Sequence, residues 1–348
     1  YLDEILIPKL IPAQVVRAGG RGELHHTEVC GPQGERVNAL WGLCPTPQGP
    51  AAILEVAEAC GLTLTPPDKR NVRTATSFGV GELIAVALKS GARRLIIGLG
   101  GSATNDAGAG MAQALGVRLT DAAGCELPRG GAALAKLASI DISAVEPELA
   151  KAEVLLASDV TNPLCGPEGA TAVYGPQKGA DAEAVAELDA ALRNFSKVAA
   201  QDLKRDVSSV RGAGAAGGLG AGLMLFANAK VRPGIELIME LIGFEELIKD
   251  ADLIFTGEGF TDSQTARGKT PAGIAALAKR YKIPVVCLSG GLSADAGSLY
   301  ASGISALSGI ARAPISLEEC VKQAAGLVEE ASERCARLIK VGLGIVSR

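Results

Sequence analysis

The stretch from Arg93 to Gly108 constrains the possible folds of this chain more than any other. An apolar run with β-branched residues, Arg93–Ile97, stops at a cluster of glycines, and a segment rich in Ala and Met follows with helical spacing from Gly108 to Leu115. This order predicts a strand, a tight loop and a helix. With 44 glycines and only 3% aromatic residues, the whole chain suits an α/β fold with many such junctions.

The loop between that strand and helix is dense in polar side chains. Its glycines let backbone N–H groups turn toward a bound anion, and the positive end of the next helix adds a favourable field. A turn or a helix cap alone needs fewer polar side chains. The candidate contacts to a nucleotide phosphate are Gly100, Gly101, Ser102, Thr104 and Asn105, and Asp106 adds a carboxylate for a metal ion or for general-base catalysis.

Composition argues against several classes of protein. A net charge of −4 without a long basic run argues against a nucleic-acid partner. The eight cysteines form no CxxC pair, so we interpret them as reduced thiols rather than as a zinc site or a disulfide framework. No apolar run approaches the roughly 20 residues that cross a bilayer, and no signal-peptide pattern opens the chain. We therefore expect a cytoplasmic protein without a membrane partner, as a monomer or homodimer.

Periodicity and turn residues predict further elements along the chain. Hairpins are expected at 24–41 and 117–127, strands at 154–158, 251–256, 283–288 and 304–307, and helices at 82–90, 182–203, 223–227, 272–281 and 317–339. The last helix begins with a capping box formed by Ser316 and Glu319. The alternation of strands and helices again indicates the α/β class.

Three predicted strands end in carboxylates among glycines. These are Asp106, Asp159, and Glu258 with Asp262. The carboxyl ends of parallel strands face the ligand crevice of an open α/β sheet. Lys178 and Lys269 offer positive charge to an anionic substrate.

A second glycine-rich loop, 212–222, continues straight into an apolar helix, which a flexible linker seldom does. Its glycines include Gly214, Gly217 and Gly218, and we expect them to let the backbone approach a bound anion closely. The loop is therefore a second candidate for nucleotide contacts.

These residue types suit phosphoryl transfer, in which catalysis rests on positioning and on neutralising phosphate charge with cations and Mg²⁺. We assign Asp106 and Asp159 to metal or base roles, and Lys178 and Lys269 to phosphate or to a substrate carboxylate. Asp262 is a further metal candidate and Glu258 a further nucleotide contact. The sequence does not separate the base from the metal ligands. Neither a Walker A motif nor the protein-kinase motifs occur.

Several motifs occur in unbroken order from about residue 16 to the C-terminus. They are Gly100–Gly108, Asp159–Gly166, Tyr174–Gly179, Gly212–Gly220, Arg232–Gly234, Thr256–Gly259, Asp262, Gln264 and Gly268-Lys269. Together they resemble the bacterial-type glycerate kinase family. The resemblance implies ATP-dependent phosphorylation of D-glycerate, commonly to 2-phosphoglycerate, with Mg²⁺ as cofactor.

The same resemblance implies two α/β domains. A central flavodoxin-like domain is expected to be inserted into a Rossmann-like domain built from both ends of the chain. Residues 1–25 would be the N-terminal remnant of the outer domain, 26–248 the central domain, and 249–348 the C-terminal part of the outer domain.

Two alternatives stay open. Family members normally begin with an Asp-Ser-Phe-Lys segment followed by Asp-Gly-Gly-Glu-Gly, and neither occurs here, so a truncated and catalytically incompetent homologue is one alternative. Val80 also stands where a threonine is common. Separately, Gly98-x-Gly100-x-x-Ala103, with Asp121 about 20 residues further on, fits the fingerprint of an NAD-dependent dehydrogenase.

Overall fold

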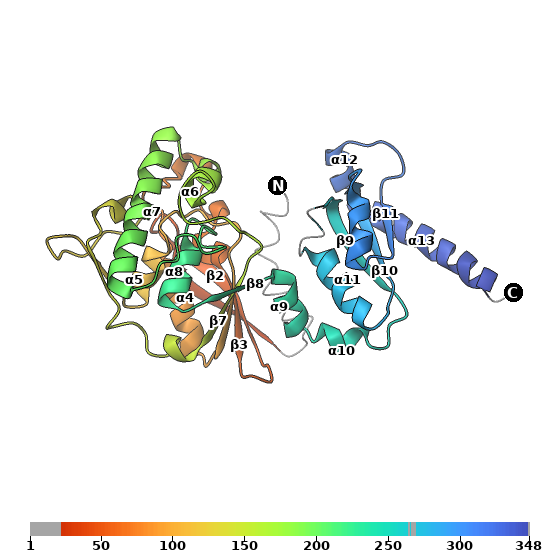
Figure 1. Ribbon diagram of the computed structural model, residues 1–348, viewed down its shortest axis with the longest axis horizontal. Coiled ribbons are helices and arrows are strands. Elements are labelled where there is room, and N and C mark those ends of the chain that lie inside the picture. The colour runs from red at the N-terminus through yellow and green to blue at the C-terminus, as the bar shows by residue number, and fades with distance from the viewer. Residues whose placement is uncertain (1–21, 264, 266–268, 347–348) are drawn as a thin grey trace. The chain divides into compact units, whose positions relative to one another are not determined.

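The computed structural model describes residues 22–263, 265 and 269–346. The chain forms two compact units, the first ending at Ile242 and the second beginning at Gly243 (Figure 1). Parallel strands and helices occur in both units, so the predicted α/β class is confirmed.

The first unit is built on a six-stranded sheet in the order β1-β2-β3-β4-β7-β8. Its strands are β1 (Glu23–Cys30), β2 (Arg36–Cys44), β3 (Ala51–Glu55), β4 (Arg94–Gly98), β7 (Glu153–Ala157) and β8 (Lys230–Arg232). β1 and β2 pair antiparallel, which confirms the hairpin predicted at 24–41. The strands from β3 to β8 in this order run parallel, so the loops that follow them leave one edge of the sheet.

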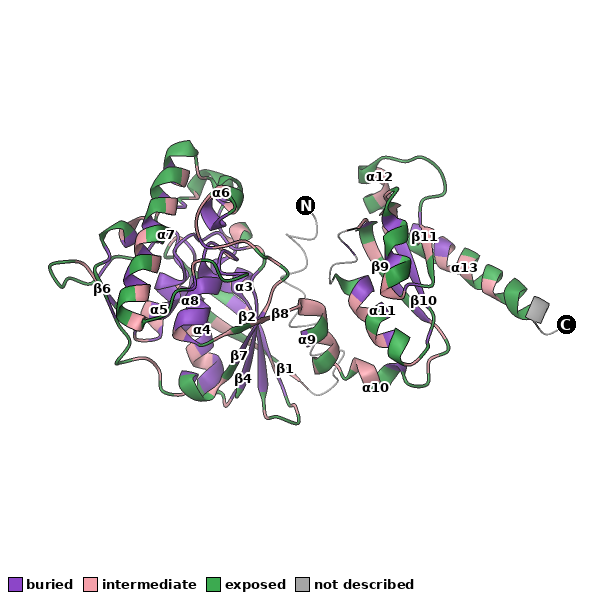
Figure 2. Ribbon diagram, viewed as in Figure 1, coloured by how far each residue is buried: buried purple, intermediate pink, exposed green. Residues whose placement is uncertain are grey.

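Helices cover both faces of this sheet, and Figure 2 shows buried strands beneath partly exposed helices. One face, with Leu54, Ile97 and Leu156, belongs to the main core beneath α4, α5, α7 and α8. The opposite face, with Ile53, Ile96 and Leu155, packs against α9. The helices of this unit are α3 (Val56–Cys60), α4 (Phe78–Lys89), α5 (Ala109–Ala114), α6 (Ala170–Tyr174), α7 (Ala182–Leu203), α8 (Leu219–Phe226) and α9 (Gly234–Leu241).

The bounds predicted for α7 are confirmed because its sequence supplies both a cap and an apolar face. The Asp181 carboxylate accepts a hydrogen bond of 2.7 Å from the backbone N–H of Ala184, which satisfies one free donor of the first turn. Leu188, Leu192 and Phe195 are fully buried on one face of the helix. This helix is part of the core, as expected.

Arg94 connects the sheet to α9 through ion pairs between its buried guanidinium and two half-exposed carboxylates. Its Nε lies 2.8 Å from a Glu153 carboxylate oxygen on β7, and its NH2 group lies 2.9 Å from a Glu240 oxygen on α9. Arg232 lies 2.8 Å from the second Glu240 oxygen and closes the network. The Arg94 side chain is only 8% exposed, whereas Glu153 and Glu240 are 46% and 40% exposed, so water reaches these pairs from the carboxylate side only.

The second unit has a parallel three-stranded sheet in the order β11-β10-β9. Its elements are α10 (Phe244–Ile248), β9 (Ile254–Thr261), α11 (Thr270–Arg280), β10 (Val285–Leu292), β11 (Ala306–Gly309), α12 (Leu317–Lys322) and α13 (Ala324–Val346). Ala275, Val285 and Cys287 lie at the centre of one of its two apolar clusters. Pro271 stands in the first turn of α11, where its missing N–H costs no helical hydrogen bond.

Two predicted elements are present but differ in detail from the expectation. The hairpin expected at 117–127 is formed around the turn at Asp121, since Asp121 N–H donates to the Cys125 carbonyl at 2.9 Å, Leu127 N–H donates to the Leu119 carbonyl at 2.8 Å, and Thr120 and Glu126 form an antiparallel bridge. The difference is that β5 (Arg118–Thr120) pairs as a strand with the distant β6 (Ser139–Asp141). Short-range turn signals found the bend at Asp121 but not the distant strand that completes the pair.

The helix expected at 317–339 is divided into α12 and α13 at Gln323. The Ser316 cap of the predicted capping box is confirmed, since its hydroxyl accepts a 3.2 Å hydrogen bond from Glu319 N–H, whereas the Glu319 carboxylate accepts a hydrogen bond from the Gln323 side chain. Of the apolar residues at helical spacing, Leu317 and Leu338 are exposed, whereas Ala331 is buried. Helical periodicity therefore predicted the secondary structure but not which turns have a packing partner.

The Arg94 network yields a stability prediction. Replacing Arg94 with Met leaves Glu153 and Glu240 without their shared cation, and we expect the free energy of unfolding to fall by about 2 kcal/mol. Replacing the neighbouring Arg93, whose ion pair with Glu148 is half-exposed, should cost at most about 0.5 kcal/mol. Urea denaturation measures both changes, and equal losses in the two variants would contradict this account of the network.

Candidate active site

The polar loop after β4 packs against the end of α3 rather than standing free in solvent. Leu62 N–H donates to the Gly101 carbonyl and Ala103 N–H donates to the Cys60 carbonyl, both at 2.8 Å. Ser102, Thr104, Asn105 and Asp106 are all buried, whereas Gly100 is exposed. The loop therefore presents backbone to solvent at Gly100 and directs its polar side chains inward.

Lys178 brings positive charge to this loop from a distant segment. Its Nζ donates to the Thr104 carbonyl at 2.7 Å and to the Ser102 hydroxyl at 3.1 Å. Burial lowers the pKa of Lys178 to about 8, although Cys60 and Asp106 raise it in part. An ammonium carries three N–H donors, and among the described residues two acceptors engage it, so one donor is left for an anion.

Asp106 occupies a buried position between two helix starts. One carboxylate oxygen accepts hydrogen bonds from Ser77 N–H and Ser77 hydroxyl, both at 2.9 Å, and from Gly110 N–H at 3.2 Å. The other accepts from Gly108 N–H at 3.1 Å. Burial raises the pKa of Asp106, and these hydrogen bonds counteract the rise. The carboxylate thus holds the first turns of α4 and α5 together, and this geometry favours a positioning role over direct contact with a metal ion.

The second glycine-rich loop packs its backbone on the first. Gly217 has a φ of +67°, and a Cβ built on it would lie 1.9 Å from the Thr104 carbonyl oxygen. Ala107 N–H also donates to the Gly217 carbonyl at 3.1 Å, and Gly214 N–H donates to the Asn162 carbonyl at 3.0 Å. Contact between the loops therefore explains these glycines without a ligand, and their predicted contact with an anion stays a prediction.

Asn105 and Asp159 complete the described part of this region. Asn105 Nδ2 donates to the Thr171 hydroxyl at 2.9 Å, while its buried Oδ1 accepts no hydrogen bond from the described residues. Asp159 follows β7 and is exposed at the carboxyl edge of the sheet. It is therefore the more accessible of the two carboxylates predicted in the first unit.

The second unit holds the remaining predicted residues. Asp262 Oδ1 accepts hydrogen bonds from Thr265 N–H at 3.0 Å and from the Thr265 hydroxyl at 3.2 Å. Glu258 lies within β9 and is partly buried, and Lys269 is exposed at the N-cap of α11. Gln264 and Gly268, which carried part of the resemblance, lie outside the described residues.

The carboxylates predicted to hold a metal are divided between the two units. Asp106 and Asp159 belong to the first unit, and Asp262 belongs to the second. Across residues 22–263, 265 and 269–346, no group of three or more His, Cys, Asp or Glu side chains is arranged to hold a metal ion. A metal here would need ligands from the substrate or from water, as Mg²⁺ commonly has.

Comparison with known proteins resolves the family. The sequence model described as "Glycerate kinase family" matches residues 13–340. A protein named glycerate kinase from Bacillus subtilis strain 168 is 47% identical over 320 residues, which is 92% of this chain and 83% of that one. The chain belongs to the glycerate kinase family.

Other members of the glycerate kinase family are similarly close. A protein named glycerate 2-kinase from Escherichia coli K12 is 45% identical over 94% of this chain and 85% of its own length. A crystal structure of a Salmonella typhimurium LT2 protein assigned as glycerate kinase 2 superposes with a TM-score of 0.83 at 45% identity, covering 96% of this chain and 86% of that one. In the described part of this family member, no helix is long and apolar enough to cross a membrane.

In this glycerate kinase family member, the acid required by the dehydrogenase alternative has a local structural role. Asp121 Oδ1 accepts hydrogen bonds from Ala123 N–H and Cys125 N–H, each at 2.9 Å, in an exposed turn. A ribose-binding acid would instead have to reach the loop after β4. Together with the family match, this placement removes the reason for that alternative.

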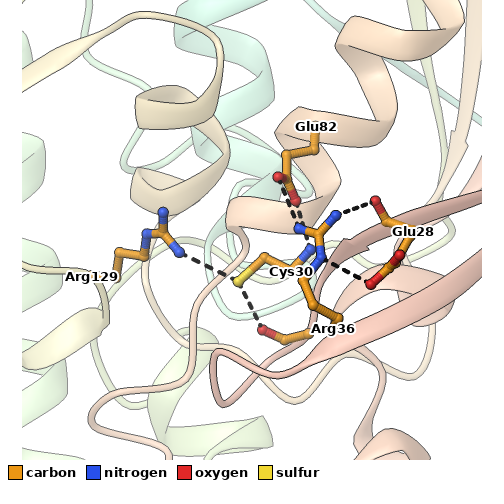
Figure 3. Close-up of polar contacts among 6 residues, drawn as sticks. Glu28, Cys30, Arg36, Glu82 and Arg129 are labelled. Carbon is orange, nitrogen blue, oxygen red and sulfur yellow. Dashed lines mark hydrogen bonds and ion pairs between the residues drawn. The ribbon is translucent and has the colours of Figure 1, made fainter.

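The sequence analysis missed a polar cluster at the start of α4 (Figure 3). Glu82 accepts hydrogen bonds from Cys30 N–H at 2.6 Å and from Arg36 at 3.3 Å, which attach the β1-β2 hairpin to the helix. Arg129 donates to Cys30 Sγ at 3.4 Å and lies over the Phe78 ring at 3.4 Å. Burial chiefly raises the pKa of the Cys30 thiol, so the sulfur stays protonated and serves packing.

The sequence analysis also missed Glu55, the last residue of β3. Its side chain is buried, and burial together with the charge of Glu58 raises its pKa to about 8. A carboxylate closing an otherwise apolar strand, Ala51–Leu54, was the sequence signal for it. The signal was visible but lacked the flanking glycines that marked the other strand ends.

Removing the negative charge of Asp106 should destabilise the fold. In Asp106→Asn an amide NH₂ replaces one acceptor oxygen and faces backbone N–H donors, so we expect a loss of about 2–4 kcal/mol in the free energy of unfolding. Asp121→Asn is the matched control, because the new amide can keep the single acceptor atom used in that exposed turn. Urea denaturation of both variants measures the difference, and an Asp106→Asn protein as stable as wild type would contradict the role given to Asp106.

The lowered pKa of Lys178 predicts how stability varies with pH. An unfolded chain returns this group to its ordinary pKa of 10.5, so between pH 8 and pH 10.5 the unfolded state binds more protons than the folded state. The contribution of Lys178 to the free energy of unfolding should therefore rise with pH across this window, by up to about 3 kcal/mol.

The measurement compares wild type with Lys178→Met by urea denaturation at pH 7.5 and pH 10.5. The difference between the two proteins should move in favour of wild type at the higher pH. Lys89→Met, a change at an exposed position near the end of α4, provides the baseline for general alkaline effects. A difference that stays constant with pH would show that Lys178 is not held in this buried setting.

Proposed function

We propose that this chain transfers the γ-phosphoryl group of ATP to D-glycerate. The observation that carries the proposal is the match, over more than nine tenths of the chain, to proteins named glycerate kinase. The buried ammonium of Lys178 beside a glycine loop supports it, because phosphoryl transfer relies on fixed cations and backbone donors around the transferred group.

Lys178 and the loop after β4 form the anion-binding part of this proposal. The free N–H of Lys178 donates to a phosphate or substrate carboxylate oxygen, while its two hydrogen bonds to Ser102 and Thr104 fix the direction of the side chain. The backbone at Gly100 and Gly101 supplies further donors. Lys269 and Glu258, in the second unit, are separate candidates for nucleotide contacts.

Asp159 is the residue of the first unit that fits Mg²⁺ best. Mg²⁺ is usually held by one or two carboxylates, by water and by substrate phosphates, so an exposed carboxylate at a strand end suits it. When bound, the ion neutralises charge on the transferred phosphoryl group. Asp262 is a second candidate ligand. Asp106, with its four hydrogen bonds inside the protein, positions the loop instead.

The product and the finer architecture complete the proposal. The name of the Escherichia coli relative, glycerate 2-kinase, supports transfer to the 2-hydroxyl group and hence 2-phosphoglycerate as product. We further propose that a flavodoxin-like central domain is inserted into a Rossmann-like outer domain, and that the protein acts in the cytoplasm as a monomer or homodimer. A catalytically incompetent homologue is the competing outcome of the test below.

The test is phosphoryl transfer from Mg-ATP to D-glycerate by the purified chain, with the product identified by phosphorus NMR. Wild type should give 2-phosphoglycerate. Asp159→Asn should lower kcat by about 100-fold or more if Asp159 holds the metal, whereas Asp121→Asn should keep wild-type activity. A folded wild-type chain that transfers no phosphate would contradict the proposed function, and an Asp159→Asn variant with wild-type kcat would remove Asp159 from the site.

A further inference from the structure

Glu55 ends β3 on the face of the sheet that packs against α9. Ile53, two residues earlier and therefore on the same face, contacts the α9 residues Ile238 and Leu241. Glu55 lies in register with Gly98 on β4. A Cβ built on Gly98 would lie 2.1 Å from Glu55 Oε1 and 2.4 Å from Oε2. The carboxyl group therefore occupies the space that the missing side chain of Gly98 leaves.

No structural role accounts for this carboxyl group. Glu55 occupies the N-cap position of α3 but makes no side-chain capping hydrogen bond. Among the described residues, none donates a hydrogen bond to its carboxyl oxygens and none forms an ion pair with it, although the residue is only 3% exposed. Burying a carboxyl without partners destabilises a fold. An apolar residue of similar size would pack there without this cost, so the carboxyl needs a functional explanation.

The position of Glu55 supplies that explanation. Gly98, its neighbour across the strands, is the residue from which the loop holding Lys178 departs. Gly98 is in turn in register with Ala157, two residues before Asp159. Glu55 thus lies in the same row at the carboxyl edge of the parallel strands, about 10 Å across two strand spacings from β7. This is the edge at which open α/β sheets bind ligands.

We propose that Glu55 is the general base of the reaction, which rests on the proposed function. Its carboxylate accepts the proton of the acceptor hydroxyl of glycerate as that oxygen forms a bond to the γ-phosphorus. The bond between the γ-phosphorus and the β,γ-bridging oxygen breaks, and ADP leaves with that electron pair. Glu55 then releases the proton to water after the products depart.

The electrostatic surroundings of Glu55 suit this role. The ionisable group that acts on it most is Glu58 on α3, and on α9 the Glu240 carboxylate is already paired with Arg94 and Arg232. Burial and Glu58 raise the pKa of Glu55 to about 8. A general base works best when its pKa lies near the working pH. By contrast, Asp106 is fully buried and its carboxylate accepts four hydrogen bonds from inside the protein.

The experiment compares wild type with E55Q, E55D and the matched control E58Q in the Mg-ATP and D-glycerate assay across pH. E55Q should lower kcat by about 100-fold or more with little change in the KM for glycerate, and should abolish the acidic limb of the pH profile. E55D should restore part of kcat together with that limb. E58Q should keep kcat and shift the limb to lower pH, because it removes a charge that raises the pKa of Glu55.

Two outcomes of the assay would overturn the proposal. One is a kcat for E55Q within about threefold of wild type, and the other is a reduced kcat with the acidic limb intact, which would place the base elsewhere. Circular dichroism melting confirms that each variant is folded. If E55Q does not fold, E55D and E58Q provide the test. An acidic limb that lies at the same pH in E58Q as in wild type would equally contradict the assignment.

A second measurement does not depend on turnover. Infrared difference spectra of wild type minus E55D at pH 7 should show the band of a protonated, buried carboxyl, and adding D-glycerate should shift that band. A band unchanged by D-glycerate, or absent, would overturn the assignment of Glu55. An inactive wild type with a shifted band would instead count against the proposed function alone, so the two failures are distinguishable.

Discussion

The arrangement of the first unit depends on one buried carboxylate. Asp106 accepts hydrogen bonds from Ser77 at the start of α4 and from Gly108 and Gly110 around the start of α5. Helix starts carry unsatisfied N–H groups and a partial positive charge, so a buried anion between two of them satisfies donors that would otherwise be lost. The same residue ends the polar loop, and the loop in turn holds Lys178. Asp106, which the sequence predicted to be a catalytic residue, therefore fixes the geometry of the loop that holds Lys178.

Two buried ionisable groups in this unit have pKa values shifted in opposite directions by the same cause. Burial lowers the pKa of Lys178 and raises that of Glu55, each to about 8, because in both cases it disfavours the charged form. Neither forms an ion pair with another described side chain. Such groups change charge readily when an anionic ligand arrives, whereas the paired Arg94 and Glu240 stay charged and serve stability.

The sequence predicted what depends on local pattern and missed what depends on distant contacts. Strand alternation at 24–41 and the capped, amphipathic segment at 182–203 gave correct elements, because caps and periodicity are properties of neighbouring residues. The proximity of Lys178 to Thr104 and of Gly217 to the same carbonyl could not be predicted, since no local signal records which loops meet. Glycine density indicated close backbone approach, but the approaching group is protein backbone.

The meeting of the two loops has a consequence for how this chain is made. Thr104 contacts Lys178 and Gly217, which lie on the order of a hundred residues later in the chain. Contacts of such long sequence separation form slowly. During synthesis from the N-terminus, β4 and its loop emerge well before either partner. The loop can therefore pack on the end of α3 early, but it lacks its contacts with Lys178 and Gly217 until most of the first unit has left the ribosome.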